Sequence, residues 1–233
     1  MLVHGGGHGG WCYKPVASLL RQQGHEVYAP TLTGLADRKH LLSPDLGLDT
    51  HFADVANLIE FEDLSEVILV GHSYGGMVIT GAADRVGNRI AQLVFLDGAI
   101  PLNGEALVDV SPGLLALAGT TRTVDGVELG LWPDEAATMI YGLNGCQYEQ
   151  WAMARLTPHP WKTVLDPLFL TNPDAVAALP RTIINCPASL ANRPDTIRSR
   201  WSKAERVWEI DTGHDLMLTE PEETARMLHL LTG

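Results

Sequence analysis

Cysteine is scarce in this sequence, and its scarcity excludes two common ways of holding a small protein together. The 233 residues include three cysteines, Cys12, Cys146 and Cys186. They are odd in number, widely spaced and without the spacing of metal ligands, so neither a disulfide framework nor a zinc site is indicated. We therefore expect three reduced thiols, no metal and no other bound cofactor.

Basic residues are also few. Lys and Arg number 16 against 28 Asp and Glu, which gives a formal net charge of -12 with histidine neutral. A chain of this charge is repelled by the phosphate backbones of nucleic acids. We expect no nucleic-acid partner.

Long apolar runs are missing as well. No run approaches the roughly 20 residues that a membrane-spanning helix needs, and no basic segment leads into an apolar stretch at the N-terminus as a signal peptide would. We expect a cytoplasmic protein with no membrane partner.

What the chain does have is 45% hydrophobic residues against 19% charged ones, enough to bury a substantial core. Composition leaves open whether two copies form a homodimer.

Apolar patterning predicts that strands and helices alternate over the first 100 residues. The expected strands cover 1–4, 26–29, 67–70 and 93–96, and the expected helices cover 14–24, 49–60 and 75–86. Strands that alternate with helices pair in parallel through right-handed crossovers. We expect an α/β fold with an open, mostly parallel sheet and helices on both faces.

The alternation stops at about Pro101 and resumes at about Pro180, and Pro, Trp and Gly are frequent between them. Residues 101–180 are expected to form a mainly helical cap, inserted after the strand that ends at Asp97. Residues 1–100 and 181–233 then form one core. Its remaining expected elements are strands at 182–185 and 207–210 and a helix from about residue 220.

Residues 71–75 read Gly-His-Ser-Tyr-Gly and match G-x-S-x-G between a predicted strand and a predicted helix. In this context the pattern forms a nucleophile elbow, a tight turn that exposes the serine hydroxyl at the carboxyl end of the strand. Ser73 is a candidate nucleophile. The alternative is a tight turn that happens to contain serine.

A serine hydroxyl is a poor nucleophile until a base accepts its proton. His214 is the candidate base, because its loop, residues 211–215, follows the last predicted strand, which ends at the same sheet edge as the elbow. The alternative is a histidine in a surface loop. His25, His40 and His159 fit that description better, because none follows a core strand through a glycine turn.

A glycine-rich loop, residues 4–10 with the sequence HGGGHGG, follows the first predicted strand. Its backbone N–H groups have no obstructing side chains, which is what a developing oxyanion requires. A phosphate loop would need G-x-G-x-x-G or a G-K-[ST] ending, and Lys14 is placed for neither. Two histidines without a carboxylate, and not on a helix, make a poor metal site. We interpret His4 and His8 as residues that organise the loop.

The order of these three motifs resembles the α/β-hydrolase fold over essentially the whole chain. More narrowly, HGGGHGGW, GHSYGGMV and TGHDLMLTEP are similar to the cap-bearing subgroup of methyl-ester hydrolases, hydroxynitrile lyases and bacterial carboxylesterases, including pyrethroid-cleaving esterases. The resemblance implies that Ser73 is the nucleophile and His214 the base. It also implies that the N–H groups of Gly6 and Tyr74 form the oxyanion hole.

The catalytic acid departs from the pattern of the family. Relatives usually place it just after the second-to-last strand, but residues 186–191 contain no carboxylate. Some members of the fold carry the acid at the end of the strand after the elbow helix, and that strand ends here at Asp97. Asp97 is therefore the candidate acid, with Asp195 and Glu105 as alternatives. Otherwise Asp97 would cap the loop at 98–100.

The hydroxynitrile lyases of this subgroup rely on a lysine directly after the catalytic histidine and on a threonine in the oxyanion loop. The corresponding residues here are Asp215 and Gly5. A carboxylate would repel the cyanide that the lysine attracts, which argues against cyanohydrin cleavage.

Together these residues predict a serine carboxylesterase that hydrolyses apolar carboxylic esters of modest size through an acyl-enzyme intermediate. The alternatives are a non-catalytic or weakly catalytic small-molecule receptor on the same fold, and C–C bond cleavage as in the lyases. Apolar cap side chains would line the pocket, although each could equally belong to the core of the cap. The residues expected to contact substrate are His72, Leu114, Leu117, Trp132, Met139 and Trp151.

Overall fold

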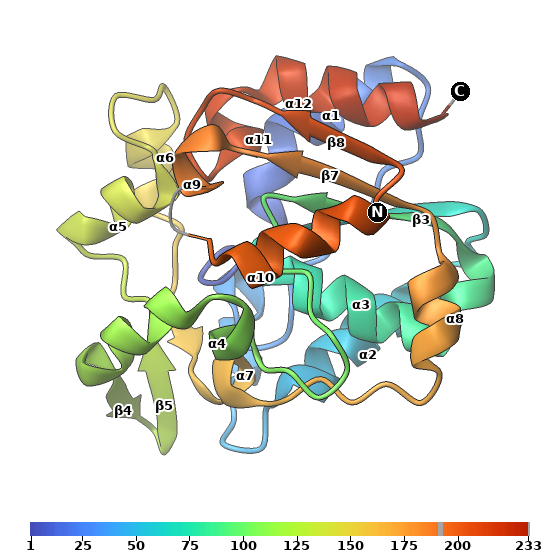
Figure 1. The fold of residues 1–233 in the computed structure, drawn as a ribbon. Helices are drawn as coiled ribbons and strands as arrows, with labels where there is room; N and C mark the ends of the chain where they lie inside the picture. The colour runs from blue at the N-terminus through green and yellow to red at the C-terminus, as the bar shows by residue number, and fades with distance from the viewer. Residues whose placement is uncertain (191–192, 233) are drawn as a thin grey trace.

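The central layer of the fold is a five-stranded sheet with the order β1-β2-β3-β7-β8 (Figure 1). The structure is a computed structural model and describes residues 1–190 and 193–232. The strands are β1 (Leu2–Val3), β2 (Val67–His72), β3 (Ile90–Leu96), β7 (Arg181–Asn185) and β8 (Arg206–Glu209). All neighbouring pairs are parallel. The residues that follow β2, β3 and β8 are therefore brought to one edge of the sheet.

Helices cover both faces of this sheet (Figure 1). Those on one face are α1 (Lys14–Gln22), α11 (Leu216–Thr219) and α12 (Pro221–His229), and those on the other are α2 (Leu48–Phe61), α3 (Gly75–Val86), α8 (Pro173–Ala178) and α10 (Asp195–Arg198). The sheet thus separates two apolar cores.

Each central strand contributes to both cores, because side chains alternate between the faces of a sheet. Leu69 and Phe95 pack into the core with α2 and α3, whereas Val70 and Val94 pack into the core with α1 and α12. A strand that is buried on both faces has a continuous apolar sequence. For this reason β2 and β3 could be predicted from the sequence.

Most of the predicted elements are confirmed. The helix expected at 75–86 is α3, and those expected at 14–24 and 49–60 are α1 and α2. The strand expected at 26–29 is wrong. The N–H of Leu2 donates to the carbonyl of Tyr28 at 2.8 Å, but no ladder forms there, because β1 is too short to pair further.

Between β3 and β7 the chain leaves the central sheet and forms short helices and a second sheet, of antiparallel order β4-β5-β6 (Figure 1). We call residues 101–180 the insertion. Its main elements are α4 (Leu107–Val110), η4 (Pro112–Thr120), β4 (Arg122–Val124), β5 (Val127–Gly130), α5 (Glu135–Tyr141), α6 (Glu149–Met153), β6 (His159–Pro160) and α7 (Lys162–Leu165). Helices were expected here, but the small sheet was not.

The signal for that sheet is the pair Asp125-Gly126 between β4 and β5. Both residues have positive φ, 49° and 80°, as a tight hairpin turn requires.

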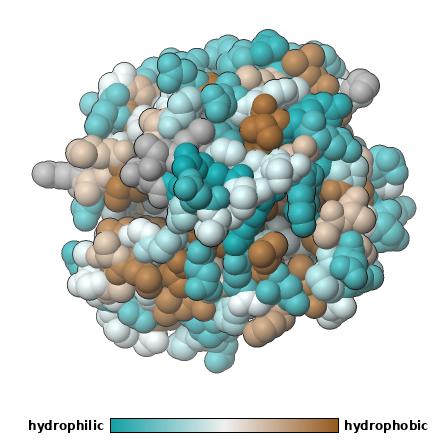
Figure 2. Space-filling view, in the orientation of Figure 1, coloured by the Kyte–Doolittle hydropathy of each residue, from teal (hydrophilic) through white to brown (hydrophobic). Residues whose placement is uncertain are grey.

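The surface of the insertion keeps some apolar side chains: Figure 2 shows hydrophobic residues gathered at the lower left of the view. Met139, on α5, is 74% exposed.

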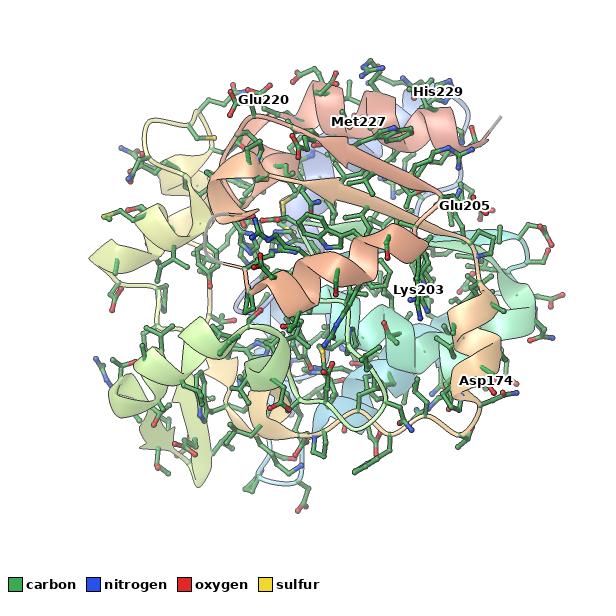
Figure 3. All side chains as sticks on the ribbon, in the orientation of Figure 1. Asp174, Lys203, Glu205, Glu220, Met227 and His229 are labelled. Carbon is green, nitrogen blue, oxygen red and sulfur yellow. The ribbon has the colours of Figure 1, made fainter. Side chains whose placement is uncertain are left out.

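The last long helix fixes the end of the chain against its beginning. Met227 and His229 lie on α12 (Figure 3), and His229 Nδ1 is 2.8 Å from Nε2 of His25, which follows α1. No helix in the described ranges is long and apolar enough to cross a membrane. Shorter helical segments are η1 (Gly10–Tyr13), η2 (Ala36–Leu41), η3 (Gly87–Arg89), α9 (Pro187–Leu190), η5 (Ser199–Lys203) and η6 (Leu230–Thr232).

Candidate active site

Ser73 lies in the tight turn between β2 and α3. Its φ is +51°, a left-handed conformation that costs a residue with a side chain about 1–2 kcal/mol. The turn is crowded, because a Cβ atom on Gly71 would lie 2.5 Å from the carbonyl oxygen of Gly75. A strained serine between closely packed glycines is the geometry of a nucleophile elbow.

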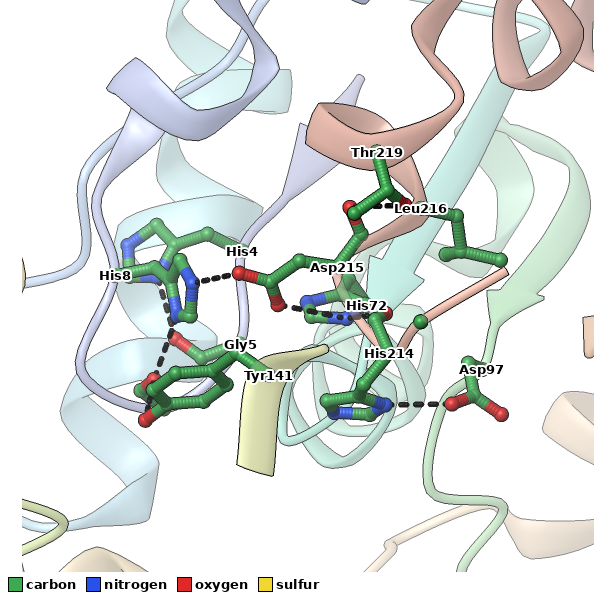
Figure 4. Close-up of polar contacts among 12 residues, drawn as sticks. His4, Gly5, His8, His72, Asp97, Tyr141, His214, Asp215, Leu216 and Thr219 are labelled. Atoms are coloured by element: carbon green, nitrogen blue, oxygen red, sulfur yellow. Dashed lines mark hydrogen bonds and ion pairs between the residues drawn. The ribbon is translucent and has the colours of Figure 1, made fainter. Parts of the chain in front are cut away.

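Asp97 lies beside this turn, at the end of the neighbouring strand β3. The backbone joins the two positions, because the N–H of Ala99 donates to the carbonyl of Ser73 at 2.9 Å. The buried carboxylate of Asp97 accepts a hydrogen bond from His214 Nδ1 at 2.5 Å (Figure 4). A carboxylate can only accept, so Nδ1 carries hydrogen and Nε2 is left to exchange a proton with another group.

Two further side chains hold the other oxygen of Asp97. Ser189 Oγ and Arg193 Nη2 each donate to Asp97 Oδ1 at 2.6 Å. Burial alone would raise the pKa of Asp97, but the hydrogen bond from His214 and the charges of His214 and Arg193 hold that pKa well below its usual range. Asp97 is therefore an oriented carboxylate at neutral pH.

Ser189 and Arg193 were not predicted as site residues. Ser189 lies within residues 186–191, the stretch after β7 where the family resemblance led us to expect the acid. A hydrogen-bond donor to Asp97 stands where the usual carboxylate is missing. That missing carboxylate was the signal that could have drawn attention to this stretch.

The alternative acids lie elsewhere. Asp195 is exposed and forms an ion pair within α10. Glu105 pairs with Arg200 at 2.6 Å. The structure therefore brings Asp97, rather than Asp195 or Glu105, to His214.

The glycine loop packs directly against the elbow. A Cβ atom on Gly5 would lie 2.9 Å from Ser73 Cβ, so a larger residue would not fit. His4 Nδ1 donates to the carbonyl of Gly5 at 2.8 Å, and its Nε2 accepts from the N–H of Leu32 at 3.0 Å. Burial lowers the pKa of His4 to about 3. The neutral ring thus holds the peptide group between Gly5 and Gly6.

Gly6 and Tyr74 carry the N–H groups expected to form the oxyanion hole. Neither N–H donates to another group within the described residues, so both remain available to a ligand. Gly6 is covered by the insertion, because a Cβ atom there would lie 2.8 Å from Leu131 Cδ1. The Tyr74 side chain is buried, with its hydroxyl 2.7 Å from His51 Nδ1. The oxyanion role of the two N–H groups stays a prediction.

Two histidines are more deeply buried than the sequence indicated. His72, expected to contact substrate, is 0% exposed and donates from Nε2 to the carbonyl of His214 at 2.9 Å. His159, interpreted as a surface histidine, is also 0% exposed and accepts from the N–H of Gly7 at 3.2 Å. Both interpretations are corrected: these rings support the loops around the site. Their partners are remote in sequence, so no local pattern could show the contacts.

A cavity of about 490 Å³ lies beside Ser73, within the size range of small-molecule sites. Asp97 and His214 also line it. Of the side chains expected to contact substrate, Leu114 and Met139 line the cavity. Apolar lining that was not expected comes from Leu107, Val110, Ile140 and Ile197.

The other expected contacts lie outside this cavity. Leu117 packs against the core, and Trp151 packs edge-on against Trp11 with ring centroids 5.2 Å apart. The indole N–H of Trp132 donates to the carbonyl of Leu129 at 3.2 Å. These apolar residues serve the packing of the protein, which apolar character alone could not distinguish from pocket lining.

The described residues offer no obvious metal site. Within residues 1–190 and 193–232, no group of three or more His, Cys, Asp or Glu side chains is placed to hold an ion. The three cysteines are free thiols, and Cys12 and Cys186 are buried.

A parallel sheet with a serine elbow after one strand and a histidine loop after the last defines a protein of the α/β-hydrolase type. The sequence profile of the Alpha/beta hydrolase family matches residues 1–227. The chain belongs to this family, and the fold expected from the three motifs is confirmed.

Similar proteins include one of nearly full length. The "Carbendazim hydrolyzing esterase" of Nocardioides sp. (strain SG-4G) is 34% identical over 240 residues, which cover 99% of this chain and 98% of that protein. The "Putative methylesterase 11, chloroplastic" of Arabidopsis thaliana is 32% identical over 111 residues, 47% of this chain and 28% of that protein.

Solved structures share the fold. An extracellular alpha/beta-hydrolase from a Paenibacillus species has a TM-score of 0.79 at 23% identity, over 97% of this chain and 96% of that one. A pyrethroid hydrolase has a TM-score of 0.76 at 20% identity, over 97% of this chain and 94% of that one. At these identities the likeness establishes the fold alone.

Proposed function

We propose that the protein is a serine ester hydrolase that works through an acyl-enzyme intermediate. The observation that carries the proposal is the 2.5 Å hydrogen bond between His214 Nδ1 and Asp97, at a cavity that Ser73 also lines. A histidine held at one nitrogen by a carboxylate, at the same cavity as a strained serine, is an arrangement suited to nucleophilic catalysis.

The proposed reaction has two stages, the acylation of Ser73 and the hydrolysis of the acyl-enzyme. Ser73 Oγ attacks the ester carbonyl carbon while His214 Nε2 accepts the hydroxyl proton, and the oxyanion binds the N–H groups of Gly6 and Tyr74. His214 then gives the proton to the departing alcohol, which leaves an acyl group on Ser73. A water molecule repeats the sequence and releases the acid. Asp97 keeps the imidazole oriented and stabilises its charged form.

The substrate we infer is an apolar ester of modest size. The apolar side chains of α4, α5 and α10 that line the cavity support this choice, and we infer that the insertion acts as the substrate-binding cap of the core formed by residues 1–100 and 181–233. The nearly full-length relative is named for carbendazim hydrolysis. Carbendazim is therefore the first compound to test beside simple esters.

The competing functions have less support. A receptor that only binds its ligand would not need the His214–Asp97 hydrogen bond. Cyanohydrin cleavage is disfavoured because no cation follows the base His214. The predicted repulsion between Asp215 and cyanide is corrected, since Asp215 is buried and does not line the cavity.

The test is steady-state hydrolysis of p-nitrophenyl esters of graded acyl length, with carbendazim and a cyanohydrin in parallel. We expect many turnovers per protein molecule on the esters and loss of about 10⁴-fold or more in kcat for Ser73→Ala. A single equivalent of released nitrophenol, or none, would indicate a receptor. Turnover of the cyanohydrin alone would indicate a lyase.

A further inference from the structure

Three buried side chains connect the glycine loop to the loop of His214, and the proposed mechanism uses none of them. They are His8, Tyr141 and Asp215, at 0%, 7% and 0% exposure. We call this group the clamp (Figure 4). It reaches from the carbonyl of Gly6, in the predicted oxyanion loop, to the residue directly after His214.

The first connection runs through the ring of His8. Its Nδ1 lies 2.7 Å from the carbonyl oxygen of Gly6, and its Nε2 lies 2.8 Å from Asp215 Oδ2. A carbonyl and a carboxylate both accept hydrogen bonds, so both ring nitrogens must donate. His8 is therefore an imidazolium that is paired with the carboxylate of Asp215 inside the protein.

The second connection runs through Tyr141, at the end of α5. Its hydroxyl donates to the carbonyl of Gly6 at 3.3 Å, and its own carbonyl accepts from the N–H of Asp215 at 2.9 Å. The carbonyl of Gly6 thus receives two donors. Both of them lead to Asp215 by independent routes.

The surroundings of the ion pair are aromatic and neutral. The His8 ring is stacked on Trp11 at 5.5 Å and meets the Tyr141 ring edge-on at 4.8 Å. On the other side His72 Nε2 is 3.8 Å from Asp215 Oδ1, and burial lowers the pKa of His72 to about 3. The remaining titratable groups that interact electrostatically with Asp215 are Cys12, Tyr13, Cys186 and His214.

An ion pair in such a place is costly. Removing two charges from water opposes their attraction, and an apolar pair of the same size often fills the space with equal or greater stability. What the His8 imidazolium adds is direction, because its two hydrogen bonds, one to Asp215 and one to the carbonyl of Gly6, constrain the lengths and angles of both contacts. The glycine loop and the base loop come from opposite ends of the chain, residues 4–10 and 211–215, so a directional link between them sets their spacing.

We propose that the clamp is a positioning device that keeps the N–H of Gly6 in register with His214, so that both act on the same reacting carbonyl. The inference rests on the proposed function and deepens it. His8, Tyr141 and Asp215 are positioning residues, since they reach the reaction through Gly6 and His214. Catalysis is sensitive to such register, because a displacement of about 1 Å can cost about 10²-fold in rate.

The protonation of His8 can be tested in the wild-type protein. We expect ¹⁵N-edited NMR of the imidazole groups to show two protonated nitrogens on His8 at pH 8, with the signals assigned by their loss in His8→Gln. One protonated nitrogen at pH 8 would overturn the conclusion that His8 is an imidazolium that donates to both Gly6 and Asp215. This measurement needs no folded variant of Asp215.

The positioning role is tested by two variants that each keep one of the two hydrogen bonds of His8. The variant His8→Asn presents an amide near the place of Nδ1 and can still reach Gly6, whereas His8→Gln presents an amide near the place of Nε2 and can still reach Asp215. We expect both variants, and Asp215→Asn, to lose about 10- to 100-fold in kcat with KM within about threefold. Tyr141→Phe removes one of the two donors to Gly6 and should lose about 3- to 10-fold.

The inhibition constant of a trifluoromethyl ketone reports on the oxyanion hole, because the adduct of this ketone with serine carries an oxyanion. A clamp that only stabilised the fold would not change this constant in a folded variant. We expect its inhibition constant to rise in parallel with the loss of kcat across the four variants. The matched control is Asp84→Asn, which removes the same charge from a carboxylate that binds Thr171 and Asn172 away from the cavity. It should leave kcat and the inhibition constant unchanged.

The proposal fails if folded variants of His8 and Asp215 keep kcat and the inhibition constant within twofold of wild type. It also fails if KM rises while kcat stays the same, since that pattern marks substrate binding rather than register. Either result leaves the proposed function standing, provided that the wild-type protein turns over esters and Ser73→Ala does not.

Discussion

The two walls of the cavity hold their side chains by different means. On the core wall, Asp97 is 1% exposed and receives hydrogen bonds from three side chains. On the wall formed by the insertion, Met139 is 74% exposed and Ile140 47% exposed. Hydrogen bonds fix direction, whereas apolar contacts fix only proximity.

This difference separates chemistry from selectivity. A proton transfer requires defined atoms at defined angles, so it belongs on the wall where buried strands and hydrogen bonds fix each atom. The recognition of an apolar ester requires only a surface of suitable shape. We therefore expect changes on the core wall to alter kcat, and changes on the wall of the insertion to alter KM and the preferred acyl length.

The largest effect is expected for Asp97→Asn. The amide would offer His214 Nδ1 a different partner and favour the wrong tautomer, so kcat should fall by roughly 10²–10⁴. Kinetics with a p-nitrophenyl ester measures this loss, and circular dichroism checks the fold. Asp195→Asn is the matched control, because that exposed carboxylate does not face the cavity, and it should cost little. If Asp195→Asn lost most of its kcat while Asp97→Asn kept a near-normal kcat, Asp195 rather than Asp97 would be the acid.

The next effect concerns stability on the core wall. His72 has a pKa of about 3 in the folded protein against 6.5 for an exposed histidine. Between these values the unfolded chain binds a proton that the folded protein does not, so stability falls as pH falls below 6.5. At pH 5 this cost is about 2 kcal/mol relative to pH 7.5, about 30-fold in the unfolding constant.

The variant His72→Gln isolates that cost, because glutamine keeps a donor near the place of Nε2 and does not titrate. Urea unfolding measures the free energy of unfolding at pH 7.5 and at pH 5.0. The decrease in this free energy between the two pH values should be about 2 kcal/mol smaller in the variant than in the wild type. Equal losses in the two proteins would mean that His72 is not the buried neutral histidine described here.

The smallest effect is expected on the wall of the insertion. Leu114→Ala enlarges the cavity, so KM for short acyl chains should rise by about 2- to 10-fold while kcat changes little. Leu115→Ala is the control, since the neighbouring side chain is 54% exposed and does not line the cavity. A loss in kcat as large as that of Asp97→Asn would remove the distinction between the two walls.

The same contrast explains which features could be predicted. Strands β2 and β3 and the position of Ser73 follow from local patterns: continuous apolar runs and glycines around a tight turn. Asp97 could be proposed as the acid because it ends a recognisable strand, at a position where the resemblance to the fold allows the acid to lie. The support from Ser189 and Arg193 and the link between His8 and Asp215 were missed, because these contacts join residues 92 to 207 positions apart. No local pattern encodes such pairings.

The wall of the insertion was the least predictable part. Leu114, Leu117 and Met139 are all apolar residues of the same segment, yet only Leu114 and Met139 line the cavity. Which apolar side chain faces the cavity depends on how short helices pack on one another. That packing has no periodic signature in short elements.

The central claim is that Ser73 is a nucleophile activated by His214, and covalent labelling tests it most directly. A fluorophosphonate forms a phosphonyl-serine that resembles the tetrahedral species of the proposed reaction. Intact-protein mass spectrometry should show one adduct, located on Ser73 by peptide mapping, absent from Ser73→Ala and formed far more slowly in His214→Gln. Labelling that persists in Ser73→Ala, or that proceeds at the wild-type rate without His214, would contradict the claim.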